Sequence, residues 1–197
     1  MNYLAHAYFS FNHPEILVGN MISDFVKGKK KFDYPPAIQK GIMLHRMIDE
    51  YTDSHAATHA AKQFFKPAVA TYCGAFMDVV YDHFLAIDKN EFPGDTLKEF
   101  TTSTYKSLEN YIPLFPEKFA RMFPYMKEQD WLYNYQFRWG IEKSFGGIVR
   151  RAAYLENSEE AFIAFNENYD ELKKYADAFL PDIKKYTAEK LSMLLKN

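Results

Sequence analysis

Apolar residues recur at intervals of three and four along most of the chain, the spacing that turns one face of an α-helix toward a core. No stretch shows the strict alternation typical of a β-strand. The pattern predicts an all-α fold, a single compact helical domain of about seven or eight helices over residues 1–197. Residues 113–126 hold three prolines and are predicted as a connector. The predicted helices cover residues 1–10, 14–26, 36–65, 67–87, 96–111 and 129–155, and then run from about 158 to 195 with a start or bend at Pro181.

The composition is that of a globular domain. Hydrophobic residues make up 48% of the 197 residues and aromatic residues 18%, enough for a full core. The formal net charge of −2 gives no support to a nucleic-acid partner. The single cysteine, Cys73, lies in an apolar stretch and is predicted to be a buried, inert thiol, as suits a reducing compartment. With no signal-like start and no membrane-length apolar run, the protein is expected to be cytoplasmic, with no membrane partner.

A first group of candidate chemical residues lies in the segment GIMLHRMIDEYTD. His45, Asp49 and Asp53 are each four residues apart, so on a helix they form one line of side chains. An imidazole and carboxylates on one helix face are suitable ligands for a divalent metal. The alternative is an ordinary ion pair on a helix surface, because such spacing is frequent by accident.

A second group lies in the segment MDVVYDHFL. Asp78 and Asp82 are one turn apart within an otherwise apolar helix, and His83 is adjacent to Asp82. Buried carboxylates are costly unless they are paired or bound to a metal. The alternative is a solvated stripe or charge at a helix N-terminus. Two such helices make a divalent-metal hydrolase the first interpretation.

The other candidates are single residues or short charged runs. Asp24 follows a short apolar stretch, and His6 lies on a mostly apolar helix where a histidine is more often part of the core. Arg150 and Arg151 are suited to bidentate phosphate contact, or else are surface cations. A lysine loop follows Asp24 and would attract an acidic protein or a phosphate-bearing substrate. The loop lysines are Lys27, Lys29, Lys30 and Lys31.

Four segments in this order resemble the acyl carrier protein phosphodiesterase family: MNYLAHAYFS, GNMISDFVKG, GIMLHRMIDEYTD and DVVYDHFL, with GGIVRR as a weaker similarity. Members of this family hydrolyse the phosphodiester that joins 4′-phosphopantetheine to a serine of acyl carrier protein. The family is considered a divergent relative of the His-Asp metal-dependent phosphohydrolases, with manganese as the favoured ion. The resemblance therefore implies a fold distantly similar to theirs, a bound Mn²⁺ (with Mg²⁺ or another divalent metal as the alternative) and acyl carrier protein as substrate. The adjacent pair here, Asp82–His83, has the reverse order of the superfamily's pair.

The resemblance and the candidate residues together lead to a working hypothesis for the site. His6 or His83 would supply a proton to the leaving serine oxygen, and Arg46 or the Arg150–Arg151 pair would hold the phosphate charge. The lysine loop would dock the carrier protein. Two alternatives stay open: a metal phosphohydrolase that acts on a nucleotide or other small phosphoester, and a non-catalytic helical module that binds carrier proteins. The sequence does not fix the oligomeric state. The expected metal ligands are Asp24, His45, Asp49, Asp82 and His83.

Overall fold

The computed structural model describes residues 1–196, which form eleven α-helices and four 3₁₀ turns and contain no strand. The all-α prediction is therefore confirmed. The α-helices are α1 (Tyr3–Tyr8), α2 (Pro14–Ile22), α3 (Pro36–Ser54), α4 (Ala56–Val69), α5 (Cys73–Ala86), α6 (Thr96–Glu109), α7 (Glu117–Glu128), α8 (Trp131–Asn134), α9 (Arg138–Val149), α10 (Glu159–Glu167) and α11 (Tyr169–Lys196). The 3₁₀ turns are η1 (Ser23–Phe25), η2 (Gly28–Asp33), η3 (Ala70–Tyr72) and η4 (Ile112–Leu114).

The helix count exceeds the predicted seven or eight because several predicted boundaries were wrong. The stretch 129–155 is divided into α8 and α9 rather than being one helix. The predicted connector 113–126 contains most of α7, with Pro124 inside that helix. Pro67 and Pro181 lie inside α4 and α11 rather than starting new helices. A proline removes one backbone hydrogen bond, but packing of an apolar face outweighs this loss when the flanking turns are buried.

The predicted helix 36–65 ends early, at Ser54. His55 has an extended backbone there, and its Nδ1 accepts a hydrogen bond from the backbone N–H of Ala57 at 3.2 Å. Histidine is not among the usual N-cap residues, so the sequence pattern gave no sign of this boundary. The turn separates α3 from α4 and redirects the chain.

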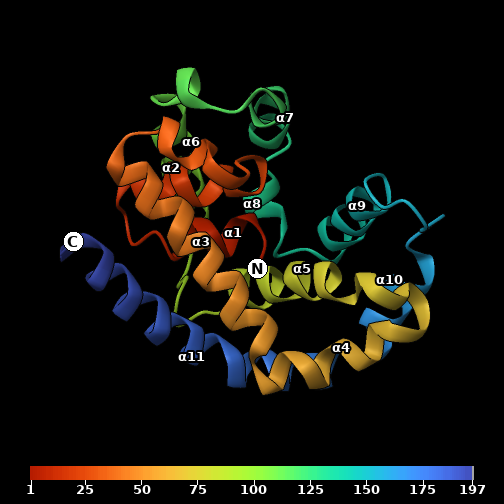
Figure 1. Cartoon of the computed structure of the whole chain (residues 1–197). Helices are drawn as coiled ribbons and strands as arrows, with labels where there is room; N and C mark the ends of the chain where they lie inside the picture. The colour runs from red at the N-terminus through yellow and green to blue at the C-terminus, as the bar shows by residue number, and fades with distance from the viewer. Residues whose placement is uncertain (197) are drawn as a thin grey trace.

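Helix α5 forms the centre of the domain. Ten of its fourteen residues are buried, and α1, α4, α9 and α11 all pack against it. Figure 1 shows α4 and α11 along one side of this helix, and the first residues of the chain contact its middle and later turns at Asp78 and Asp82. Cys73 begins α5 and is half-buried, which differs from the predicted fully buried thiol. No helix within residues 1–196 combines the length and the apolar character needed to cross a membrane.

Helices α2 and α3 pack with their backbones in direct contact at two glycines. A Cβ atom on Gly19 would lie 2.2 Å from the carbonyl oxygen of Ile38, and one on Gly41 would lie 2.4 Å from that of Ile16. Neither position has room for a side chain, so the two backbones touch. This contact brings the residue after Gly19 next to the turn of α3 that follows Gly41, where the candidate ligands begin.

Candidate metal centre

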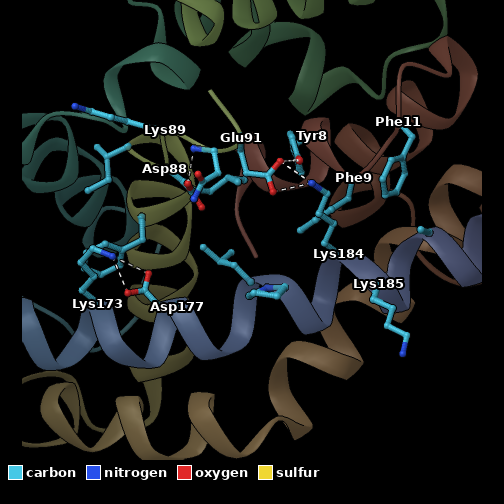
Figure 2. Close-up of a pocket in the computed structure, with 17 residues that line it drawn as sticks. Tyr8, Phe9, Phe11, Asp88, Lys89, Glu91, Lys173, Asp177, Lys184 and Lys185 are labelled. Atoms are coloured by element: carbon cyan, nitrogen blue, oxygen red, sulfur yellow. Dashed lines mark hydrogen bonds and ion pairs between the residues drawn. The ribbon is translucent and has the colours of Figure 1, made fainter. Parts of the chain in front are cut away.

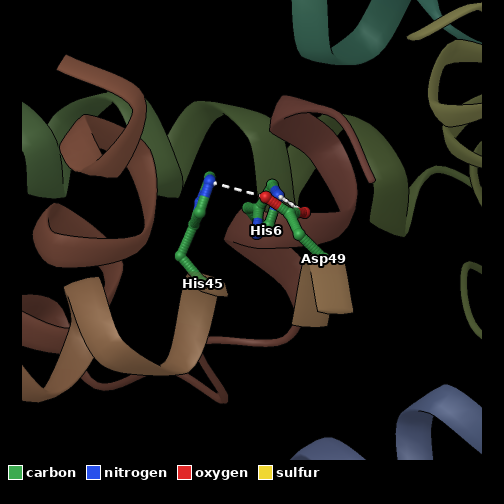
Figure 3. Close-up of side chains that lie close together, drawn as sticks. All are labelled: His6, His45 and Asp49. Atoms are coloured by element: carbon green, nitrogen blue, oxygen red, sulfur yellow. Dashed lines mark ion pairs between the residues drawn. The ribbon is translucent and has the colours of Figure 1, made fainter. Parts of the chain in front are cut away.

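Three side chains from two helices converge on one point. His6 comes from α1, and His45 and Asp49 come from successive turns of α3, as Figure 3 shows. One ligand atom from each lies within 4.8 Å of the others, and these residues form the one such group of three found within the described part of the chain. The two carboxylate oxygens of Asp49 face different rings: Oδ1 is 3.2 Å from His6 Nε2, and Oδ2 is 3.0 Å from His45 Nε2.

The main chain fixes the orientation of the His45 ring. Its Nδ1 lies 2.7 Å from the carbonyl oxygen of Asn20 and must donate to it. Its Nε2 then faces two carboxylates, Asp49 Oδ2 at 3.0 Å and Asp24 Oδ1 at 3.2 Å. Burial lowers the pKa of His45, but Asp24 and Asp49 raise it to about 9. The two carboxylates therefore favour a positive charge at Nε2, which either a proton or a bound metal ion would supply.

His6 is a buried imidazole that lacks hydrogen bonds. Its side chain stacks on His45 with ring centroids 3.8 Å apart and planes inclined by 14°. Within residues 1–196 neither ring nitrogen has a hydrogen-bond partner, although the residue is only 2% exposed. Nε2 is near Asp49 Oδ1 without hydrogen-bond geometry. Burial and the neighbouring His45 lower the pKa of His6 to about 4, so at neutral pH the ring is uncharged and offers a nitrogen lone pair.

These observations fit a divalent metal. A buried imidazole without hydrogen-bond partners is costly. A cation bound by the ring nitrogen would remove that cost and would also balance the charge of the carboxylates. The carbonyl of Asn20 plays the part of the outer partner that orients a metal-binding histidine. Imidazole and carboxylate together suit Mn²⁺, Zn²⁺ or Fe²⁺. Residues His6, His45 and Asp49 would therefore hold the ion, with Asp24 at the edge.

The carboxylate side of this centre is open to solvent. The side chain of Asp49 is 39% exposed and that of Asp24 is 69% exposed, whereas both histidines are buried. Hydrogen bonding to His45 lowers the pKa of Asp24. A substrate would therefore approach across the carboxylates, with the two rings behind them.

The amino group of Met1 contacts the same oxygen of Asp49 that faces His6. It lies 3.4 Å from Asp49 Oδ1 and 2.9 Å from Asp78 Oδ1, and it is fully buried. Burial lowers the pKa of this amine, but Asp78 and Asp49 raise it to about 11, so it carries a charge. Burial raises the pKa of Asp49, yet the amine and the two histidines bring it far below its ordinary value. No pattern in the sequence indicates this role of the amine, because it arises only from the tertiary contact.

Asp82, which is expected from the sequence to be a metal ligand, instead accepts hydrogen bonds from backbone N–H groups. Its carboxylate is 0% exposed and accepts the backbone N–H groups of Asn2, Leu4 and Ala5 at 3.2, 2.7 and 3.3 Å. Burial raises its pKa to about 7, although these hydrogen bonds act in the opposite direction. Asp82 does not belong to the group formed by His6, His45 and Asp49. A ligand role for it stays a prediction that these contacts do not support.

His83, expected both as a ligand and as a proton donor, is also engaged by other groups. Its Nδ1 lies 2.7 Å from the carbonyl oxygen of Tyr135, and its Nε2 lies 2.8 Å from the hydroxyl of Tyr169. Burial lowers the pKa of His83 to about 4, with a further contribution from the Arg138 charge. The residue therefore has a neutral ring with both nitrogens in use, outside the candidate centre.

The predicted phosphate-binding arginines lie in different settings. Arg46 is exposed and donates from Nη2 to the carbonyl oxygen of Val26 at 2.9 Å. The Arg150 guanidinium lies on its own helix, 3.5 Å from where a Cβ on Gly147 would be. Arg151 approaches Tyr3, whose pKa burial raises to about 12 while the arginine charge lowers it. Asp24 also acts on the Tyr3 hydroxyl, so this hydroxyl lies within electrostatic reach of both Arg151 and Asp24.

The lysine loop forms η2, directly after the turn that carries Asp24. Three of its four lysines are exposed, and Lys31 is half-buried with its Nζ 5.0 Å from the centroid of the Phe32 ring. The cations thus lie close in the sequence to the most exposed acid of the centre. Asp53, the third member of the helical line, instead forms an ion pair with Lys62 at 2.7 Å on the surface.

A cavity of about 750 Å³ lies elsewhere, between α11 and the segment that follows α5. Figure 2 shows Tyr8, Glu91 and Lys184 joined on one wall, and Lys173 paired with Asp177 on another. Its charged groups are largely neutralised by one another, and none of the candidate ligands lines it. The cavity is therefore distinct from the centre.

Two histidines and a carboxylate gathered at a solvent-facing point of an all-helical protein are a donor set that could hold a divalent metal. The chain belongs to the acyl carrier protein phosphodiesterase family, whose model matches residues 1–183. Its resemblance to that family is thereby confirmed.

Similar proteins cover almost the whole chain. The acyl carrier protein phosphodiesterase of Klebsiella pneumoniae (strain 342) is 29% identical over 191 residues, which are 96% of this chain and 99% of that protein. The protein of the same name from Serratia proteamaculans (strain 568) is 30% identical over the same shares. The one from Yersinia pestis is 29% identical. No solved structure matches the chain significantly, so similarity to the His-Asp phosphohydrolase fold stays an expectation.

Proposed function

We propose that the protein is a metal-dependent phosphodiesterase that removes 4′-phosphopantetheine from holo acyl carrier protein and leaves the apo form. Family membership supports the reaction, and the relatives' names give the substrate. The observation that carries the chemistry is the placement of His45 Nε2 between Asp49 and Asp24, beside the partnerless ring of His6. A cation at this point would balance the two carboxylates and give the His6 ring a partner.

The metal would be held by His6, His45 and Asp49, and Mn²⁺ is the ion that the family resemblance favours. When bound, such an ion lowers the pKa of water and polarises a phosphoryl oxygen. Asp24 faces the same point from the solvent side and is 69% exposed, so its carboxylate is placed to accept a proton from the attacking water. Asn20 keeps the His45 ring in the tautomer that directs Nε2 toward the reaction.

The substrate's negative charge would meet the arginines. Arg46, which follows His45 and donates to the carbonyl oxygen of Val26, and Arg151, which acts on Tyr3, would hold a phosphodiester that gains charge in its transition state. The loop lysines would attract the acidic carrier protein. His83 is a poor source of a proton for the serine oxygen, because its ring is neutral and both nitrogens are bonded.

Mass spectrometry of holo acyl carrier protein tests the proposal. Incubation with the enzyme and Mn²⁺ should remove the whole prosthetic arm, and the His45→Ala variant should leave the holo form intact. Cleavage of small phosphodiesters without cleavage of the holo protein would instead support a metal phosphohydrolase that acts on a nucleotide or other small phosphoester. Binding of the holo protein without any cleavage would support the non-catalytic module.

A further inference from the structure

Helix α5 directs two acids, the half-buried Asp78 and the fully buried Asp82, at the first residues of the chain. Asp78 and Asp82 lie one turn apart, and both contact residues 1–5: Asp78 pairs with the Met1 amine, and Asp82 accepts three backbone N–H groups. These two carboxylates, which are unusual in an apolar helix, thus have partners. Their partner is the peptide backbone at the beginning of α1.

Helix α1 depends on such contacts for its position. It spans six residues, and a helix of that length has little stability of its own in water. Its backbone N–H groups at Leu4 and Ala5 have no carbonyl partner one turn earlier within the helix, and Asp82 supplies their acceptor. Because Asp82 is itself buried in α5, it ties the start of α1 rigidly to the centre of the domain.

His6 follows Ala5 directly, so its ring depends on this attachment. The ring must lie 3.8 Å from that of His45 and within reach of Asp49. A small rotation or slide of α1 would move Nε2 away from the other two ligand atoms. We propose that Asp82 is a positioning residue for His6, and that it acts on metal binding through the backbone of α1 rather than as a ligand.

This inference rests on the proposed function for the role of His6, but the attachment itself can be tested without metal. In the metal-free Asp82→Asn variant, hydrogen exchange of the segment 1–9 should accelerate at least tenfold, because the amide offers one acceptor oxygen where the carboxylate offered two. Exchange in α4 and α11 should stay as in the parent protein. Unchanged protection of segment 1–9 would overturn the proposal.

A double-variant cycle then distinguishes positioning from direct ligation. In the parent protein, Asp82→Asn should weaken Mn²⁺ binding about 10- to 100-fold, the usual effect of losing an outer partner of a ligand. In a His6→Gln background the same change should have little further effect, because the residue on which Asp82 acts is already lost. An equal further loss there would show that Asp82 ligates the metal and would refute the inference.

The matched control is Tyr105→Phe. The Tyr105 hydroxyl donates to Met126 O at 3.1 Å and accepts from Leu132 N at 3.0 Å, so its loss also removes buried hydrogen bonds. This variant should lower the melting temperature without altering Mn²⁺ affinity or exchange of segment 1–9.

If Asp82→Asn does not fold, Asp82→Glu replaces it, since the longer side chain displaces the acceptor while keeping the charge. Failure of the parent protein to bind Mn²⁺ would count against the proposed function, while the exchange experiment would still decide the attachment.

Discussion

His45 is oriented by the main chain of Asn20, with 2.7 Å between its Nδ1 and the Asn20 carbonyl oxygen. His83 makes the same contact with the carbonyl of Tyr135, also at 2.7 Å. Both rings therefore direct Nε2 away from the anchoring carbonyl. The difference lies in what Nε2 meets: two carboxylates at His45, and the hydroxyl of Tyr169 at His83. The first environment attracts a cation, and the second leaves the ring neutral.

Asp49→Asn should abolish metal-dependent stabilisation and phosphodiesterase activity, because it removes the carboxylate that faces both rings. At Mn²⁺ one hundred times above Kd, the parent protein should gain about 2.7 kcal/mol of unfolding free energy. Asp49→Asn should gain almost none. Thermal unfolding with and without Mn²⁺ measures this, and a chelator should reverse the gain. Asp53→Asn, one turn along α3 and paired with Lys62 at the surface, is the control and should behave as the parent.

Gly41→Ala should destabilise the fold and disturb the centre together. A Cβ there would lie 2.4 Å from the carbonyl oxygen of Ile16, so α2 and α3 would have to separate. We expect a loss of about 1–3 kcal/mol in unfolding free energy and weaker Mn²⁺ binding, since Asn20 would move away from His45. Urea denaturation and calorimetric titration measure the two effects.

The control for that substitution is Gly74→Ala. A Cβ at Gly74 meets only the end of the Lys62 side chain, at 3.5 Å. Alanine in this helix should be neutral or stabilise by about 0.5–1 kcal/mol. If both alanine variants were equally stable, the close approach of α2 and α3 would not have the importance assigned to it.

His83 should make the metal-free protein acid-sensitive. Its pKa is lowered from 6.5 to about 4 in the folded state, chiefly by burial, so the unfolded chain takes up the proton first. The contribution of His83 is fully present above about pH 6.5 and is lost as the pH falls to about 4, a change on the order of 3 kcal/mol. The difference in unfolding free energy between the parent and His83→Gln should therefore shrink across that range. A difference that is constant with pH would contradict a buried neutral His83.

Arg151→Ala should impair turnover more than Arg150→Ala. Arg151 acts on Tyr3 beside Asp24, whereas Arg150 lies over the glycines of α9. A charged contact with phosphate is worth about 1.5–3 kcal/mol, so Arg151→Ala should lower kcat/KM by about 10- to 100-fold. Arg150→Ala should change it less than threefold. Steady-state kinetics on holo acyl carrier protein decide between the two, and equal effects would remove the distinction.

The sequence by itself determined the parts of the protein that depend on local spacing. Helical periodicity fixed the all-α class, and four-residue spacing placed His45 and Asp49 on one face of α3, because helix geometry alone sets that relation. The order of the motifs was sufficient to indicate the family. Helix ends at His55 and Asn134 were missed, since buried packing and an unusual cap decided them.

Only the tertiary structure decided which acids and imidazoles share a site. His6 joins His45 because α1 is attached to α5 and lies against α2, and Asp24 joins because α2 crosses α3 at two glycines. Asp82 and His83 are of the same residue types and also lie on one helix, yet they meet backbone amides, a carbonyl and a tyrosine. Spacing along one helix fixes which way side chains point, but the opposing elements determine what they meet.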